Sequence, residues 1–229
     1  MPSLIDVLGY QGWDFLVFDG EHGTLIPGDC ENMVRAAELQ QVTPIVRVTT
    51  NEPSVILRFL DSGAQGALVP SVRSAEEAIA AVRSVKYYPS GIRGLAGVRA
   101  ADYGQKKPLS EYVVEANNET LTVIQIETAE AVEHLEEIVS VVDVDVAFIG
   151  PMDLSQSYGV PGLPQHPRVL QAIDRIVQVT LQSKCALGVM VSDAASARQW
   201  RQRGAKFIAT TFEAVLGPAM RSYLHDARA

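Results

Sequence analysis

Cysteine and basic residues are both scarce in this sequence, and each shortage excludes a class of protein. Cys30 and Cys185 are the only cysteines, which is too few for a disulfide scaffold, and they show no metal-ligand spacing. The 19 Lys and Arg residues are outnumbered by 27 Asp and Glu residues, which gives a net charge of -8. This charge disfavours nucleic acids and anionic membranes as partners.

Long hydrophobic runs are absent as well. No apolar run approaches the ~20 residues that a membrane-spanning helix requires. Residues 1–14 contain acidic residues and lack the basic start of a secretory signal. Hydrophobic residues still make up 47% of the chain and charged residues 20%, which is typical of globular proteins. We therefore expect a cytoplasmic globular protein that binds neither membranes nor nucleic acids.

Apolar strand-like runs alternate with helical stretches along the whole chain. The runs are apolar on both faces, as parallel strands covered by helices are. No Gly-rich dinucleotide fingerprint accompanies them, so the alternation favours a (β/α) barrel over a doubly wound sheet. The predicted strands cover residues 13–18, 44–48, 66–72, 121–127, 144–149, 187–191 and 207–211.

The strand count falls one short of a closed barrel. We find seven strands, whereas a TIM-type (β/α)8 barrel has eight, and the first predicted element is a helix over residues 2–10. We therefore predict an α/β protein in which residues 1–229 form a single (β/α) barrel domain, with the first strand absent from this chain.

Polar residues gather at the ends of the predicted strands. In barrels of this type, the carboxyl ends of the strands carry the reaction site, so residues from different strands meet at one rim. Taken in chain order, the polar residues at these positions are Asp19, Glu21, His22, Arg47, Gln125, Glu127 and Asp153.

Two of these carboxylates suit a divalent cation. Mg²⁺ and Mn²⁺ favour carboxylate oxygens, and Mg²⁺ usually takes one or two protein carboxylates and leaves positions for water and substrate. Glu127 and Asp153 are therefore the predicted metal ligands. Other roles stay open for each residue alone, because either could pair with an arginine, Asp153 could cap a turn, and Glu127 could start the next helix.

His22 is the predicted general base, because imidazole ordinarily titrates near neutral pH. Arg47 carries guanidinium donors that suit an oxyanion or a carboxylate, although a salt bridge to Asp19 or Glu21 is the alternative. Asp61 ends a predicted helix, where negative charge is unfavourable. This position hints at a partner such as His22, with an ordinary surface acid as the alternative.

Residues 88–108 form an irregular stretch, rich in Gly and Arg, that is too long for a routine connection. The stretch opens no clear helix, so its glycines are weak evidence for a phosphate loop. A mobile surface loop and a lid or subunit contact are both open interpretations. No Schiff-base lysine is expected, because no lysine ends a strand convincingly and Lys206 begins one.

Six segments resemble the HpcH/HpaI aldolase family, and in order they cover essentially the whole chain. They are FDGEH (18–22), VRV (46–48), LDSGA (60–64), YPSGIRG (88–94), QIET (125–128) and FIGPMDLS (148–155). Each is weak alone, whereas the ordered set is specific. The resemblance implies a (β/α)8 barrel and a metal-dependent class II aldolase that reversibly cleaves a 4-hydroxy-2-oxo acid to pyruvate and an aldehyde.

The resemblance also implies a role for each site residue. Glu127 and Asp153 would ligate Mg²⁺, Mn²⁺ or Co²⁺, and His22 would be the base. Arg47 would stabilise the enolate, and Asp61 would raise the basicity of His22. The groups implied to contact the keto acid are Gln125 and the Gly150, Pro151 and Met152 turn, beside Asp153. The family further implies a homo-oligomer, a hexamer built from dimers that exchange their last helix.

Two departures from the family pattern and two rival functions accompany this prediction. The chain lacks the Gly-Leu-Trp type of first strand that family chains usually have, and Met152 stands where the family's reference enzyme has a small residue, which bears on acceptor preference. One rival is a citrate-lyase-β or malyl-CoA-type carbon–carbon lyase, which would need a CoA-binding surface. The other is a non-catalytic barrel that binds small molecules.

Overall fold

The computed structural model describes residues 1–229 and contains one parallel sheet of seven strands. The strands follow one another across the sheet in chain order, and each pairs in parallel with the next. They are β1 (Phe15–Asp19), β2 (Thr43–Arg47), β3 (Gly66–Val69), β4 (Leu121–Ile126), β5 (Val146–Ile149), β6 (Ala186–Val191) and β7 (Phe207–Thr210).

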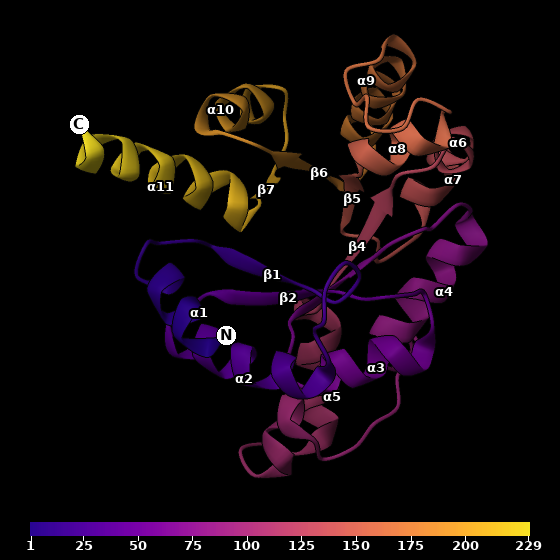
Figure 1. The fold of residues 1–229 in the computed structure, drawn as a ribbon. Helices are drawn as coiled ribbons and strands as arrows, with labels where there is room; N and C mark the ends of the chain where they lie inside the picture. The colour runs from indigo at the N-terminus through magenta and orange to yellow at the C-terminus, as the bar shows by residue number, and fades with distance from the viewer.

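Helices connect the strands and surround the sheet (Figure 1). No helix combines the length and the apolar composition that crossing a lipid bilayer requires. The helices are α1 (Pro2–Gly9), α2 (Pro27–Leu39), α3 (Pro53–Asp61), α4 (Ala75–Val85), the short 3₁₀ segment η1 (Arg99–Gly104), α5 (Leu109–Glu119), α6 (Ala129–Glu133), α7 (Leu135–Ser140), α8 (Pro151–Ser157), α9 (Pro167–Leu181), α10 (Ala194–Gln202) and α11 (Phe212–Arg228).

The sheet curls until its two edge strands, β1 and β7, face each other (Figure 1). They form no backbone ladder with one another. Phe15 at the start of β1 instead stacks on Phe207 at the start of β7, with ring centroids 4.3 Å apart. The predicted TIM-type barrel with one strand lacking is therefore confirmed.

Alternation along the strands divides the apolar residues into two cores. Side chains of one parity, such as Val123 on β4 and Phe148 on β5, pack inside the curled sheet. Side chains of the other parity, such as Ile124 and Ile149, pack against the surrounding helices in a cluster of 40 buried residues. The same alternation holds just beyond the strand ends, and it therefore decides which polar side chains face the rim.

Some boundaries differ from the predicted ones for identifiable reasons. The predicted third strand ran to residue 72, but β3 ends at Val69 because Pro70 cannot donate to the ladder. The predicted helix over 129–139 divides into α6 and α7 at His134, whose φ and ψ are -97° and 18°. The Gly-Pro-Met-Asp turn is the start of helix α8, with Pro151 at its first position and Asp153 in its first turn.

Candidate active site

The charged side chains of the site occupy the alternating positions whose side chains point into the curled sheet. Arg47 follows Ile45 on β2, and Glu127 follows Val123 and Gln125 along β4, at spacings of two residues. Because all strands run in parallel, these side chains converge at one rim, the carboxyl ends of the strands. Glu127 and Gln125 are only 3% and 2% exposed, so both are buried beneath that rim.

Arg47 is held by two carboxylates from the neighbouring strand and its turn. Asp19 and Arg47 are direct partners in the β1–β2 register. The Arg47 guanidinium donates to Asp19 through Nε at 2.9 Å and Nη2 at 2.5 Å, while Nη1 lies 3.1 Å from Glu21 Oε2. The predicted alternative of a salt bridge is therefore present, but it leaves donors free because a guanidinium has five N–H groups.

Asp19 also shapes the turn that carries His22. Its Oδ1 accepts the main-chain N–H groups of Glu21 at 2.9 Å and His22 at 3.2 Å. Burial opposes ionisation of Asp19, but the hydrogen bonds and charge of Arg47 and these two N–H groups hold its pKa below the ordinary value. The His22 ring is exposed, with Nε2 3.9 Å from Glu21 Oε2. The imidazole is thus accessible at the rim.

Both oxygens of Glu127 accept a hydrogen bond. The main-chain N–H of Ser71 donates to Oε1 at 2.6 Å, and the side-chain amide of Gln125 donates to Oε2. Burial raises the pKa of Glu127, and the negative charges of Asp153 and Glu21 raise it further, against these two hydrogen bonds. Glu127 therefore carries its charge in a buried position where neighbouring carboxylates disfavour ionisation.

The surroundings of Glu127 and Asp153 fit a divalent cation. Glu127 is buried without an arginine or lysine in hydrogen-bond contact, and the side-chain oxygen of Gln125 beside it has no partner. A cation between Glu127 and Asp153 would offset the charge that raises the pKa of Glu127. No third His, Cys, Asp or Glu joins them as a cluster. Two carboxylates are what Mg²⁺ commonly takes from a protein.

Gly150 lets β4 and β5 approach closely at this point. A Cβ at position 150 would lie 2.8 Å from Glu127 Cβ and 3.3 Å from the amide nitrogen of Gln125. Glycine is therefore the residue that fits beside the carboxylate. Helix α8 begins immediately afterwards and places Asp153 and the exposed side chain of Met152 at the rim.

Asp61 lies away from these residues. It is the last residue of α3, which leads into the amino end of β3, whereas His22 follows the carboxyl end of β1. Its Oδ1 accepts a hydrogen bond from Arg93 Nη2 at 3.0 Å. Within the chain the structure therefore pairs Asp61 with Arg93, not with His22. The role of Asp61 in the reaction stays a prediction.

Comparison with known proteins agrees with this arrangement. Residues 1–217 match the family model described as HpcH/HpaI aldolase/citrate lyase. The chain is 40% identical over 215 residues to a hydroxypyruvate/pyruvate aldolase of Sagittula stellata, covering 93% of this chain and 84% of that protein. It is 37% identical to a 4-hydroxy-2-oxo-heptane-1,7-dioate aldolase of Klebsiella pneumoniae, covering 92% and 79%.

The chain belongs to the HpcH/HpaI aldolase/citrate lyase family.

A solved structure supports the same assignment at the level of the fold. A family protein from Burkholderia cenocepacia matches all of this chain and 91% of its own, with a TM-score of 0.94 and 33% identity. The predicted family is therefore confirmed. Membership places the protein among the carbon–carbon lyases.

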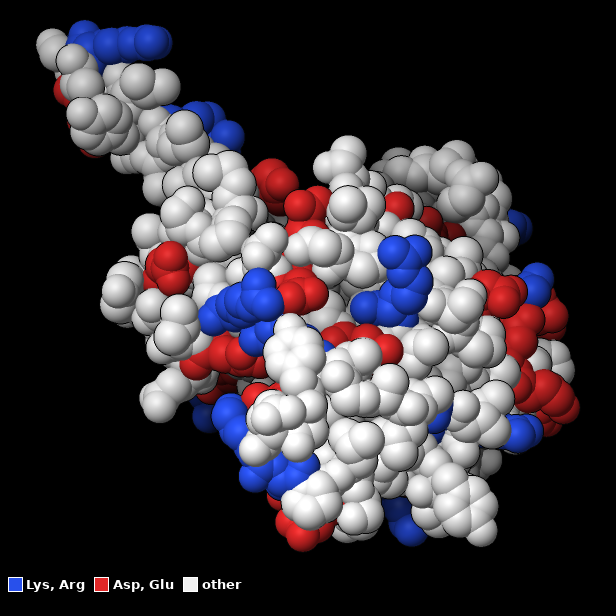
Figure 2. All heavy atoms as spheres, turned by 90° about the horizontal axis from the view of Figure 1, so that it is seen from below, with Lys and Arg blue, Asp and Glu red and all other residues white.

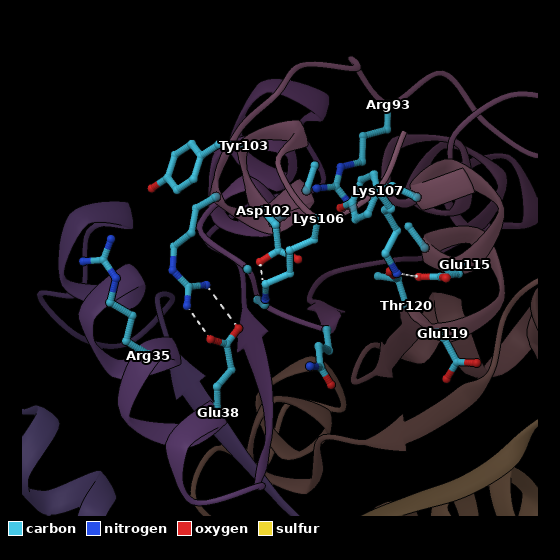
Figure 3. Close-up of a pocket in the computed structure, with 18 residues that line it drawn as sticks. Arg35, Glu38, Arg93, Asp102, Tyr103, Lys106, Lys107, Glu115, Glu119 and Thr120 are labelled. Carbon is cyan, nitrogen blue, oxygen red and sulfur yellow. Dashed lines mark hydrogen bonds and ion pairs between the residues drawn. The ribbon is translucent and has the colours of Figure 1, made fainter. Parts of the chain in front are cut away.

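A cavity of about 730 Å³ lies at the other end of the strands, away from the rim that carries Glu127 and Arg47. Figure 3 shows this cavity between the end of α2, the loop that includes η1, and α5. Arg99 pairs with Glu38 and Lys107 with Glu115, so charges on its walls compensate one another. Part of the irregular 88–108 stretch lines the cavity and is fastened to α2 by Arg99.

The sequence pattern did not identify Ser71 as a residue of the rim. The predicted third strand included Ser71 because it ran to residue 72. Pro70 was the available signal, since a proline inside a central strand argues for the strand's end. Asp19 and Glu21 were recognised as strand-end residues, but their shared hold on Arg47 required the tertiary structure.

Proposed function

We propose that the protein is a metal-dependent class II pyruvate aldolase that reversibly cleaves a 4-hydroxy-2-oxo acid to pyruvate and an aldehyde. The observation that carries the proposal is the rim itself, where the buried Glu127 carboxylate has no arginine or lysine in contact and lies beside the unpartnered side-chain oxygen of Gln125. The aldolase names of relatives at 37–40% identity support it.

Glu127 and Asp153 would hold the metal, which we propose to be Mg²⁺, Mn²⁺ or Co²⁺. When bound, such an ion supplies Lewis-acid polarisation of a keto group. The buried oxygen of Gln125 and the first turn of α8, at Gly150, Pro151 and Met152, would contact the keto acid. Main-chain N–H groups in a first helical turn lack intrahelical acceptors and can therefore donate to a carboxylate.

The chain's own groups would then move one proton and stabilise one charge. His22, directly or through water, removes the proton of the 4-hydroxyl group, and the C3–C4 bond breaks to give the aldehyde and the pyruvate enolate. Arg47 stabilises the enolate oxygen with the N–H groups that Asp19 and Glu21 leave free. Return of this proton to C3, from His22 or the water it acts through, then gives pyruvate and restores the base.

We also propose that the protein is a homo-oligomer, with a hexamer as the expected form. Helix α11 supports this, since it projects from the body (Figures 1 and 2) and has no buried residue. Its apolar side chains include Phe212, Leu216, Met220, Tyr223 and Leu224, which recur at helical spacing. In such an assembly, Asp61 could meet His22 only if the α3 end of one copy faced the rim of another.

Chelation tests the proposed chemistry. Pyruvate release from a 4-hydroxy-2-oxo acid should stop in EDTA and return with added Mg²⁺, Mn²⁺ or Co²⁺. Borohydride with pyruvate should trap no adduct, because no lysine ends a strand at the rim. Full activity in EDTA, or a stable borohydride adduct, would refute the metal mechanism. A screen of pyruvate against several aldehydes would identify the acceptor.

The two rivals are separated by the same assays. Cleavage that requires a CoA thioester would favour the citrate-lyase-β or malyl-CoA type. Metal binding without turnover of any oxo acid would favour a binding protein.

A further inference from the structure

The turn after β3 has an unusual backbone at the edge of the proposed metal site. Ser71 has a φ of +57°, in the left-handed region that residues other than glycine rarely adopt. Residues kept in such conformations tend to occur at active sites and ligand clamps.

The left-handed turn directs a main-chain N–H at a buried carboxylate 56 residues away in the sequence. The N–H of Ser71 donates to Glu127 Oε1 at 2.6 Å. The Ser71 hydroxyl lies 3.5 Å from the same oxygen, at the limit of a hydrogen bond. Pro70 has no N–H to offer, so Ser71 is the first residue after β3 that can make this contact.

We propose that Ser71 is a positioning residue, whose main-chain N–H fixes the Glu127 carboxylate in the orientation that binds a divalent cation. The proposal rests on the metal site proposed above. Gln125 donates to Oε2 from the other side, so each oxygen has one short hydrogen bond, and the Ser71 hydroxyl lies only at the limiting distance from Oε1. An ionised carboxylate has about four lone-pair positions. Each oxygen of Glu127 therefore keeps a free position for a metal, while rotation of the side chain is restricted.

In this arrangement the main-chain N–H of Ser71, and not its side chain, orients the Glu127 carboxylate. Hydrogen-bond partners of ligating carboxylates orient the ligand, and their loss typically lowers metal affinity about 10- to 100-fold. Alanine and glycine at position 71 would keep the N–H. Glycine would also adopt the left-handed conformation without strain.

The decisive experiment removes the N–H and keeps the serine side chain. An amide-to-ester replacement at position 71, with the α-hydroxy analogue of serine, should raise the dissociation constant for Mn²⁺ about 10-fold or more. Ser71→Ala and Ser71→Gly are the matched controls and should bind Mn²⁺ within about threefold of the wild type, since both keep the donor. Mn²⁺ binding is measured by electron paramagnetic resonance without substrate.

Two results would overturn the proposal. The ester variant could bind Mn²⁺ as tightly as the wild type, or Ser71→Ala and Ser71→Gly could lose as much affinity as the ester. A second measurement needs neither metal nor the ester variant. In the metal-free wild type, the Ser71 amide proton should resonate downfield and move upfield in Glu127→Ala.

An amide resonance that does not respond to Glu127→Ala would contradict the contact itself. This second measurement also separates the two proposals. If the wild type binds no Mn²⁺ but the amide proton responds, the metal function fails while the hold of Ser71 on the Glu127 carboxylate stands.

Discussion

Arg47 is the cation around which the carboxylates of the rim are arranged. It contacts Asp19 and Glu21 directly, and the charge of Glu127 also acts on it. Burial lowers the pKa of Arg47, but its hydrogen bonds and ion pairs with these carboxylates more than offset that effect. Glu127 has no such cation in contact with it. One residue is therefore suited to stabilise an oxyanion and the other to bind a metal.

Alanine substitution should separate these two roles. Glu127→Ala removes a carboxylate ligand, so Mn²⁺ affinity should fall at least 10-fold. Arg47→Ala should keep Mn²⁺ binding within a few-fold but lower turnover about 100-fold or more, since it removes donors to the enolate. Calorimetric titration with Mn²⁺ and steady-state kinetics give the two readouts. Equal loss of metal affinity in both variants would contradict this division.

Asp19 gives the rim a stability that depends on pH. Its folded pKa is depressed, so its contribution is present above the ordinary aspartate pKa and is lost as pH falls through the depressed value. Asp19→Asn should therefore lower Tm at pH 7, and the difference from wild type should close in acid. Asp174→Asn, which removes an exposed ion pair with Arg203, is the control and should shift Tm little at either pH. A constant gap for Asp19→Asn would disprove this linkage.

At the scale of elements, the site depends on the close packing of β4 against β5. Ile126 and Ile149 are partners in the register, so Glu127 and Gly150 follow side by side. The absence of a side chain at Gly150 gives Glu127 and Gln125 their room. The strand ends thus position the ligand through backbone spacing as well as through hydrogen bonds.

Gly150→Ala should damage the site and the fold together. The added methyl would meet Glu127 Cβ at 2.8 Å, so we expect a loss of roughly 1–3 kcal/mol in stability, together with weaker Mn²⁺ binding. Gly28→Ala is the matched control, because a Cβ there meets nothing within 4 Å. Its stability should stay within about 0.5 kcal/mol of wild type. Chemical denaturation measures both, and unchanged metal binding in Gly150→Ala would contradict the expectation.

At the scale of the whole molecule, helix α11 stands out because none of its residues is buried. Helix α11 projects from the body, and Figure 2 shows it as a mainly uncharged extension with basic residues along it and at its far end. A row of exposed apolar side chains of this length is typical of a protein–protein contact. We propose that another copy of the chain covers it, and that residues 1–229 otherwise form a single domain.

Charge on the apolar face of α11 should reduce the assembly. Leu216→Glu with Met220→Glu places two carboxylates on that face, so light scattering after size exclusion should show a smaller particle. His225→Glu is the control, because nine residues from Leu216 place it about 180° around the helix. It should keep the wild-type mass. A wild type that is monomeric at micromolar concentration would contradict the oligomer.

Polar residues at the predicted strand ends identified much of the rim, and the exceptions have specific causes. Arg47, Gln125 and Glu127 lie at one end of the sheet because parallel strands share a direction, and side chains two residues apart point to the same face. Ser71 was missed because apolar residues on both sides of Pro70 suggested a longer strand. The unfavourable charge of Asp61 at a helix end hinted at His22 as a partner, but a charge alone does not reveal which end of the barrel it occupies, and within the chain Asp61 pairs with Arg93.

The sequence by itself determined the order of the elements, the parallel sheet and the residue types available for chemistry, because alternation and strand-end polarity are local patterns. Only the tertiary structure decided which partners these residues have. Ser71 reaches Glu127, and Arg93 reaches Asp61, across 56 and 32 residues of chain. Such pairs depend on register and on the curl of the sheet, which no local pattern records.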